Sequence, residues 1–107
     1  MASLSPEDAA QKLKERPEEY TLLDVREPDE REVAAIEPSI HVPMNDVPRR
    51  LAEIPKDKKL IVYCHHGSRS MMVAGYLQGA GYTSVSNLDG GIDAWSRKVD
   101  PSVPRYS

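Results

Sequence analysis

The residues best suited to chemistry lie together around the chain's only cysteine, in the segment Cys64-His65-His66-Gly67-Ser68-Arg69-Ser70. A deprotonated thiol is a strong nucleophile. Successive backbone N–H groups in a tight loop, which Gly67 makes possible, can converge on such an anion. Arg69 adds a positive charge, and Ser68 and Ser70 can donate hydroxyl groups. We therefore expect Cys64 to be a nucleophilic thiolate that solvent and small anions can reach.

Three other interpretations of this segment have to be weighed. Free cysteines are often buried structural residues, but the glycine, serine, arginine and histidine neighbours argue against a packed apolar site. His65 and His66 could bind a metal with Cys64, but adjacent histidines tend to diverge and there is no second cysteine, so we expect no metal site. A redox pair is disfavoured because the Cys-x-x-Cys spacing is absent. We expect both histidines to line a pocket, where partial positive charge would favour the thiolate.

The elements that must position this segment can be predicted from apolar runs and from the prolines and glycines that interrupt them. Short strands are expected at 21–25, 39–43, 59–63 and 84–88, and helices at 6–15, 28–35, 45–53, 69–80 and 92–98. This alternation indicates an α/β fold with a parallel sheet covered by helices. Because the carboxyl ends of parallel strands meet at one edge, Asp24, Cys64 and Asn87 should lie near one another.

Other polar residues near the predicted strand ends have simpler interpretations. Asp24 and Arg26 could touch a substrate directly, but we favour a buried pair that supports the cysteine loop. The acidic residues between 27 and 37 are interpreted as a solvated helix face, with docking of a basic partner as the alternative. Gly90 and Gly91 are expected in a tight turn between a strand and a helix, and Trp95 in the core.

Composition excludes several classes of protein. The 107 residues are of the size of one domain, predicted here to span 1–107, and a single cysteine allows no internal disulfide. No apolar run approaches the length of a membrane helix, and the start of the chain does not resemble a signal peptide. A net charge of −3 disfavours nucleic acid as a partner. We expect a cytoplasmic monomer.

Four stretches, in order along nearly the whole chain, resemble the rhodanese family of sulfurtransferases. The segment at 64–70 is similar to the family's active-site loop. Leu23-Asp24-Val25-Arg26-Glu27-Pro28 and Leu88-Asp89-Gly90-Gly91-Ile92-Asp93-Ala94-Trp95 resemble its early and late signatures. Val99-Asp100-Pro101-Ser102-Val103-Pro104-Arg105-Tyr106 is similar to the tail of rhodanese domains fused to sulfur-carrier-activating, E1-like adenylyltransferases. One departure is the stretch at 34–40, where many members have Gly-His-Ile.

The resemblance implies a mainly parallel five-stranded sheet with helices on both faces. It also implies transfer of sulfane sulfur from thiosulfate or a persulfide donor, through a persulfide on Cys64, to a thiol or a sulfur-carrier protein, with no cofactor. By position in the family motif, the substrate-binding residues would be His65, His66, Gly67, Ser68, Arg69 and Ser70. Asp24 and Arg26 would support the loop.

Two alternatives to sulfur transfer come from relatives of the same fold. Phosphatases built on this scaffold place five residues between cysteine and arginine, whereas four separate Cys64 from Arg69. The shorter loop makes a smaller cradle that suits sulfur better than a phosphate ester. Other rhodanese-like domains lack the cysteine and only bind partners, and the presence of Cys64 argues against that role.

Overall fold

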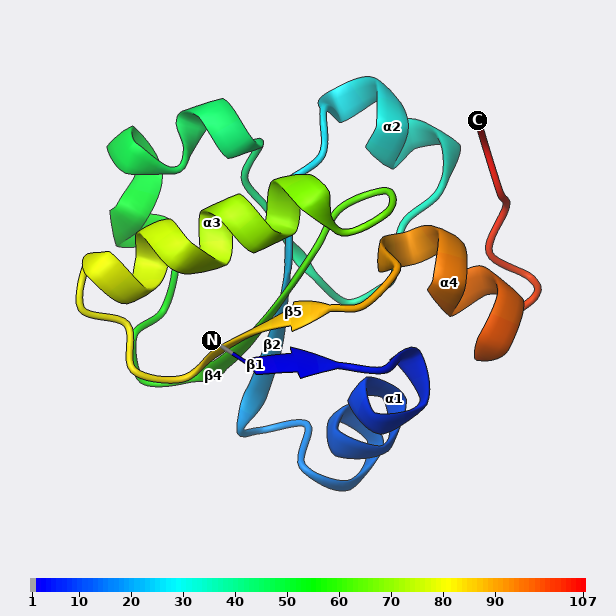
Figure 1. Ribbon diagram of the computed structural model, residues 1–107, viewed down its shortest axis with the longest axis horizontal. Coiled ribbons are helices and arrows are strands. Elements are labelled where there is room, and N and C mark those ends of the chain that lie inside the picture. The colour runs from blue at the N-terminus through cyan, green and yellow to red at the C-terminus, as the bar shows by residue number, and fades with distance from the viewer. Residues whose placement is uncertain (1) are drawn as a thin grey trace.

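A five-stranded, entirely parallel sheet forms the centre of the computed structural model, which describes residues 2–107 (Figure 1). The strands lie in the order β1-β5-β4-β2-β3, and every neighbouring pair is parallel. Their bounds are β1 Ala2–Leu4, β2 Tyr20–Asp24, β3 Ile40–His41, β4 Lys59–Tyr63 and β5 Val85–Leu88. The predicted α/β class and the five-stranded sheet are therefore confirmed.

Helices cover both faces of the sheet. The four α-helices are α1 Pro6–Glu15, α2 Pro28–Val33, α3 Ser68–Gly79 and α4 Gly91–Lys98. Helix α3 packs on one face, where Val73 and Leu77 meet Leu23 and Val62 in one apolar cluster. Helices α1 and α4 pack on the opposite face in a second cluster (Figure 1). Successive residues of β2 and β4 point into opposite clusters, which explains why Leu22 and Leu23 of β2, and residues 60–63 of β4, form unbroken apolar runs.

Helix α1 begins as the sequence indicates. The Ser5 hydroxyl accepts a hydrogen bond from the backbone N–H of Asp8 at 3.1 Å, and Pro6 occupies the first turn. At the end of α3, Gly81 has a φ of +97°, a backbone conformation that favours glycine. None of the helices within residues 2–107 has the length and apolar character needed to cross a membrane.

Three predicted elements differ from the structure, and one strand was not predicted. β1 was not expected from the sequence, because three residues with two exposed side chains carry no apolar pattern. The helix expected at 45–53 is two 3-10 helices, η1 Met44–Asp46 and η2 Pro48–Glu53, because Pro48 has no N–H to continue a single helix. The strand expected at 39–43 is shortened to Ile40–His41, and the helix expected at 28–35 ends at Val33.

Candidate active site

Backbone N–H groups of the segment 64–70, which comprises the loop after β4 and the first turn of α3, point at the sulfur of Cys64. The sulfur accepts hydrogen bonds from the N–H of Gly67 at 3.1 Å and of Ser70 at 3.4 Å. The Ser70 hydroxyl lies 3.4 Å from the same sulfur. Gly67 has a φ of +116°, and the first turn of α3 follows it directly. The loop therefore forms the anion-binding arrangement that its glycine and its position before a helix predict.

Burial of the sulfur is the main departure from the sequence-based expectation. Cys64 is only 1% exposed and belongs to the apolar cluster on the α3 face of the sheet. The reason is that the loop which donates to the sulfur also covers it, with Gly67 and Ser70 both buried. A reagent therefore needs a local opening of the loop before it can touch Cys64.

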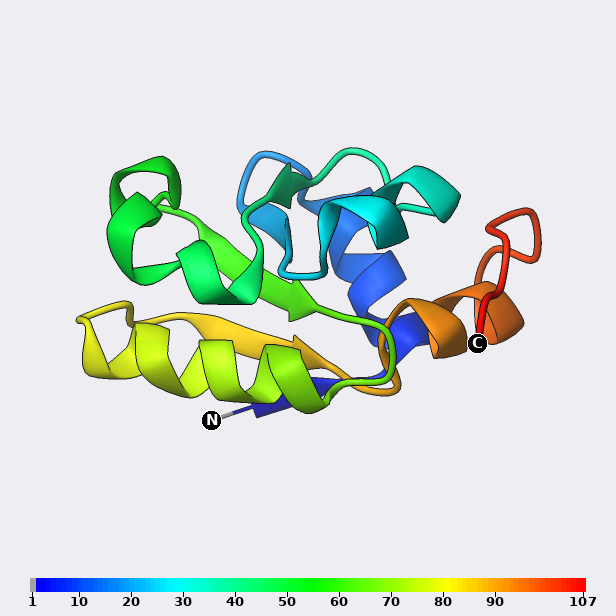
Figure 2. The same cartoon turned by 90° about the horizontal axis from the view of Figure 1, so that it is seen from above.

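The first turn of α4 holds the loop in place through backbone hydrogen bonds. The backbone N–H of Ile92 donates to the carbonyl of Cys64 at 2.9 Å, and that of Asp93 donates to the carbonyl of His65 at 3.2 Å. Figure 2 shows the loop after β4 beside this end of α4. Gly91 allows the approach, since a Cβ there would lie 2.4 Å from the Cys64 carbonyl oxygen. The predicted tight turn at Gly90 and Gly91 is confirmed, with φ values of +73° and +62°.

A buried asparagine from β5 contacts the hydroxyl next to the sulfur. The Oγ of Ser70 lies 2.5 Å from Oδ1 of Asn87 and 3.1 Å from the carbonyl oxygen of Gly67. One hydroxyl proton can serve only one acceptor at a time. Asn87 therefore competes with Cys64 for the Ser70 proton. The position of Asn87 near the carboxyl ends of the strands was predicted, but its contact with Ser70 was not. A polar residue on a buried strand is a sequence signal for such a contact.

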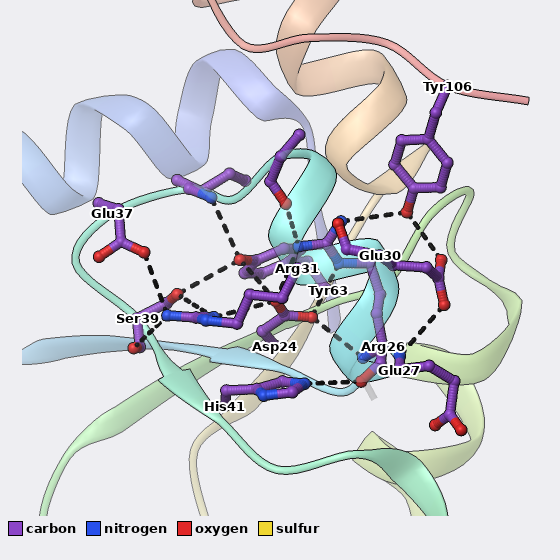
Figure 3. A network of polar contacts seen from close by, with 12 residues as sticks. Asp24, Arg26, Glu27, Glu30, Arg31, Glu37, Ser39, His41, Tyr63 and Tyr106 are labelled. Atoms are coloured by element: carbon purple, nitrogen blue, oxygen red, sulfur yellow. Dashed lines mark hydrogen bonds and ion pairs between the residues drawn. The ribbon is translucent and has the colours of Figure 1, made fainter.

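Asp24 and Arg26 form a fully buried ion pair at the end of β2 (Figure 3). Arg26 donates from Nε to Oδ1 at 2.9 Å and from Nη2 to Oδ2 at 2.8 Å. Burial acts to raise the pKa of Asp24, but hydrogen bonds from Arg26 outweigh it and hold the pKa below its usual value. The Tyr63 hydroxyl also donates to Asp24 at 3.2 Å. The pair thus joins the ends of β2 and β4, directly before Cys64.

Arg69 is held by a carboxylate from α2. Its Nη1 and Nη2 donate to the two oxygens of Glu30 at 2.7 and 2.8 Å. These hydrogen bonds lower the pKa of Glu30 to about 2. The interpretation of Glu30 as part of a solvated acidic face is therefore wrong, because its side chain is only 18% exposed and forms a bidentate pair with Arg69. Glu27, Asp29, Glu32 and Glu37 are exposed as expected.

His65 is half-buried, whereas His66 and Ser68 are exposed. The imidazole of His65 stacks on the ring of Tyr106, with ring centroids 3.9 Å apart. The centroid of the His66 ring also lies 3.9 Å from that of the His65 ring. Burial, together with the neighbouring His66, lowers the pKa of His65. The expected partial positive charge on this histidine is therefore not supported. Within residues 2–107, no three histidine, cysteine or acidic side chains are grouped so as to hold a metal ion.

Residues 5–98 match the family described as Rhodanese-like domain. The chain belongs to the rhodanese family. A sulfurtransferase of Allochromatium vinosum is 39% identical over 100 residues, which cover 94% of this chain and 92% of that protein. Thiosulfate sulfurtransferase GlpE of Pseudomonas syringae is 37% identical over 90 residues, which cover 84% of this chain and 83% of that protein.

A solved structure and a larger relative extend the comparison. The crystal structure of a rhodanese-related protein from Thermoplasma volcanium matches with a TM-score of 0.83 and 32% identity, covering 99% of this chain and 100% of that chain. Adenylyltransferase and sulfurtransferase MOCS3-1 of Zea mays is 33% identical over 102 residues, which cover 89% of this chain but 22% of that protein. The chain is therefore related both to small sulfurtransferases and to rhodanese domains of larger enzymes.

Proposed function

We propose that this chain transfers sulfane sulfur from a small anionic donor of the thiosulfate type to a thiol, with Cys64 as the nucleophile. The Cys64 thiolate attacks the outer sulfur of thiosulfate, and a new S–S bond forms at Cys64. The S–S bond of the donor breaks, and its electron pair leaves with sulfite. An acceptor thiolate then attacks the outer sulfur of the Cys64 persulfide and restores the Cys64 thiolate.

The observation that carries this proposal is the convergence of the Gly67 and Ser70 N–H groups on the Cys64 sulfur. Donors placed in this way stabilise negative charge on the thiolate, and they remain close to the charge that develops on the persulfide. A covalent intermediate divides one transfer into two displacements. Neither displacement needs a cofactor, because each bond that forms takes its electrons from the attacking sulfur.

The other site residues bind the donor or hold the loop in this proposal. Arg69 attracts the donor anion, and His65, His66 and Ser68 line its approach. Asp24 and Arg26 act indirectly, by fixing the strand ends that carry the loop. The relatives' names support sulfur transfer as the reaction class. Thiosulfate as donor, a thiol or sulfur-carrier acceptor, and action in the cytoplasm as one monomeric domain are the specific parts of the proposal.

Two assays separate the proposed activity from its rivals. Wild type should form thiocyanate from thiosulfate and cyanide, and Cys64→Ser should not, because cyanide can take the outer sulfur of the persulfide. Hydrolysis of an aryl phosphate that depends on Cys64, without thiocyanate formation, would show a phosphatase instead. Inactivity of a folded wild-type protein in both assays would indicate that the domain binds a partner and has no catalytic activity.

A further inference from the structure

The end of the chain returns to the active-site loop. After α4, the tail is fastened to this helix by the Ser96 hydroxyl, which donates to the Val103 carbonyl at 2.6 Å, and by Arg105, which donates to Asp93 at 2.9 Å. Figure 1 shows the tail running from α4 towards α2. This path brings Tyr106 against residues that are far from it in the sequence.

The hydroxyl of Tyr106 lies between two charged groups (Figure 3). It accepts from Nη1 of Arg26 at 3.0 Å and donates to Oε2 of Glu30 at 2.7 Å. Burial and the neighbouring Glu30 carboxylate raise the pKa of Tyr106 to about 12, so the phenol keeps its proton at neutral pH. A neutral phenol can donate to Glu30 and accept from Arg26 at the same time.

Glu30 is the link between Tyr106 and the loop. Its carboxylate accepts both hydrogen bonds from Arg69, one from Tyr106 and one from the backbone N–H of Glu27 at 3.1 Å. Four hydrogen bonds from three residues fix the plane of this carboxylate. Because a bidentate pair is geometrically demanding, the plane of Glu30 sets the plane of the Arg69 guanidinium.

Tyr106 also touches the loop directly. Its ring stacks on the imidazole of His65 with an interplanar angle of 9°, and its backbone carbonyl lies 2.8 Å from Nε2 of the same histidine. One residue outside the loop therefore restrains both Arg69, through Glu30, and His65, the residue after the nucleophile.

We propose that Tyr106 is a positioning residue, which holds Arg69 through Glu30 so that the loop prefers anionic reagents at Cys64. The preference for an anion can be measured by alkylation alone. Its consequence for the choice of sulfur donor rests on the proposed function.

The test is the ratio of Cys64 alkylation rates with iodoacetate, an anion, and iodoacetamide, which is neutral, at one pH. Any change in the reactive fraction of the thiol, or in opening of the loop, affects both rates and cancels in the ratio. We expect Tyr106→Phe to lower the ratio roughly fivefold, which corresponds to about 1 kcal/mol. The same change at Tyr76, an exposed tyrosine on α3, should leave the ratio unchanged.

A ratio in Tyr106→Phe equal to that of wild type would overturn the proposal, as would a wild-type ratio that Arg69→Met does not lower. If Tyr106→Phe fails to fold, Glu30→Gln replaces it. Removing a negative charge beside the loop would by itself favour an anion and raise the ratio. A lower ratio in Glu30→Gln therefore supports positioning, and a higher or equal one contradicts it.

The same variants keep this proposal separate from the proposed function. If Tyr106→Phe lowers the alkylation ratio but wild type transfers no sulfur, positioning stands and sulfur transfer fails. If sulfur transfer occurs, Tyr106→Phe should raise KM for thiosulfate and leave kcat nearly unchanged, because the Phe ring still stacks on His65. An unchanged KM would limit Tyr106 to a structural role and overturn its part in donor choice.

Discussion

The environment of the Cys64 sulfur is set by a few short contacts with neighbouring residues. Its donors, the N–H groups of Gly67 and Ser70, belong to the loop and to the first turn of α3, whereas Asn87 on β5 competes for the Ser70 hydroxyl proton. Glu30 plays a similar part for Arg69, whose Nη1 and Nη2 groups it holds through two hydrogen bonds. Gly67, Ser70 and Arg69 thus each have a hydrogen-bonding partner that fixes their direction, and electrostatic stabilisation of a thiolate requires such fixed donors.

The pH dependence of stability tests the Glu30–Arg69 pair. The pKa of Glu30 is lowered from 4.5 to about 2 in the folded protein, chiefly by hydrogen bonds from Arg69. A lowered carboxyl pKa adds stability above the unfolded pKa and loses it as pH falls through the folded pKa. The difference in the free energy of unfolding between wild type and Glu30→Gln should therefore shrink between about pH 5 and pH 2.

Urea denaturation over this pH range supplies the measurement. Glu32→Gln is the matched control, since Glu32 is an exposed carboxylate on the same helix. Its difference from wild type should stay nearly constant with pH. If wild type and Glu30→Gln lose stability in parallel on acidification, the pair does not stabilise the folded protein.

Between elements, the loop is fixed mainly where α4 begins. Two N–H groups at the start of α4 donate to the carbonyls of Cys64 and His65, so these carbonyls are satisfied by α4 rather than by the loop. The close approach depends on Gly91, whose positive φ and crowded surroundings exclude a side chain. The double-glycine turn therefore matters to the site because it lets α4 approach the backbone of Cys64 and His65.

We expect Gly91→Ala to lower both activity and stability. The added Cβ would lie 2.4 Å from the Cys64 carbonyl oxygen and 2.5 Å from that of His65, so the loop or the helix must shift. The cost should be at least about 2 kcal/mol of unfolding free energy, measured by urea denaturation. Gly75→Ala is the control, because no atom lies within 4 Å of a Cβ there, and it should stabilise α3 by about 1 kcal/mol. Wild-type activity in Gly91→Ala would refute this account of the turn.

Across the whole molecule, a network of polar side chains joins the sheet to the tail. It runs from Asp24 and Arg26 at the end of β2, through Tyr106, to Glu30 and Arg69. Arg31 adds a second ion pair to Asp24 at 3.0 Å. Because these residues come from separate parts of the chain, the network can form only when the sheet, α2 and the tail are all in place.

Asp24→Asn should lower stability and activity together. It leaves the fully buried guanidinium of Arg26 without its carboxylate, a change that typically costs about 3–5 kcal/mol. Thermal melting and sulfur transfer are measured on the same samples. Unchanged melting with lost activity would instead place Asp24 in contact with the substrate.

Sequence patterns were sufficient for local features of the fold and site. Apolar runs marked β2 and β4, and the loop composition marked Cys64 and its amide donors. They could not show the partners of Arg69 or Tyr106, because Glu30 lies 39 residues from the first and 76 from the second. Nor could they show that the loop closes over the sulfur, since burial depends on how α3 and β5 pack around it.

Intact mass of the protein after incubation with thiosulfate tests the central claim most directly. The wild type should gain the mass of one sulfur atom, which a thiol acceptor then removes, whereas Cys64→Ser should gain nothing. This result would show that the covered sulfur is reached by an anionic donor and holds a persulfide. A folded wild-type protein with no added sulfur, or the same gain in Cys64→Ser, would contradict the account.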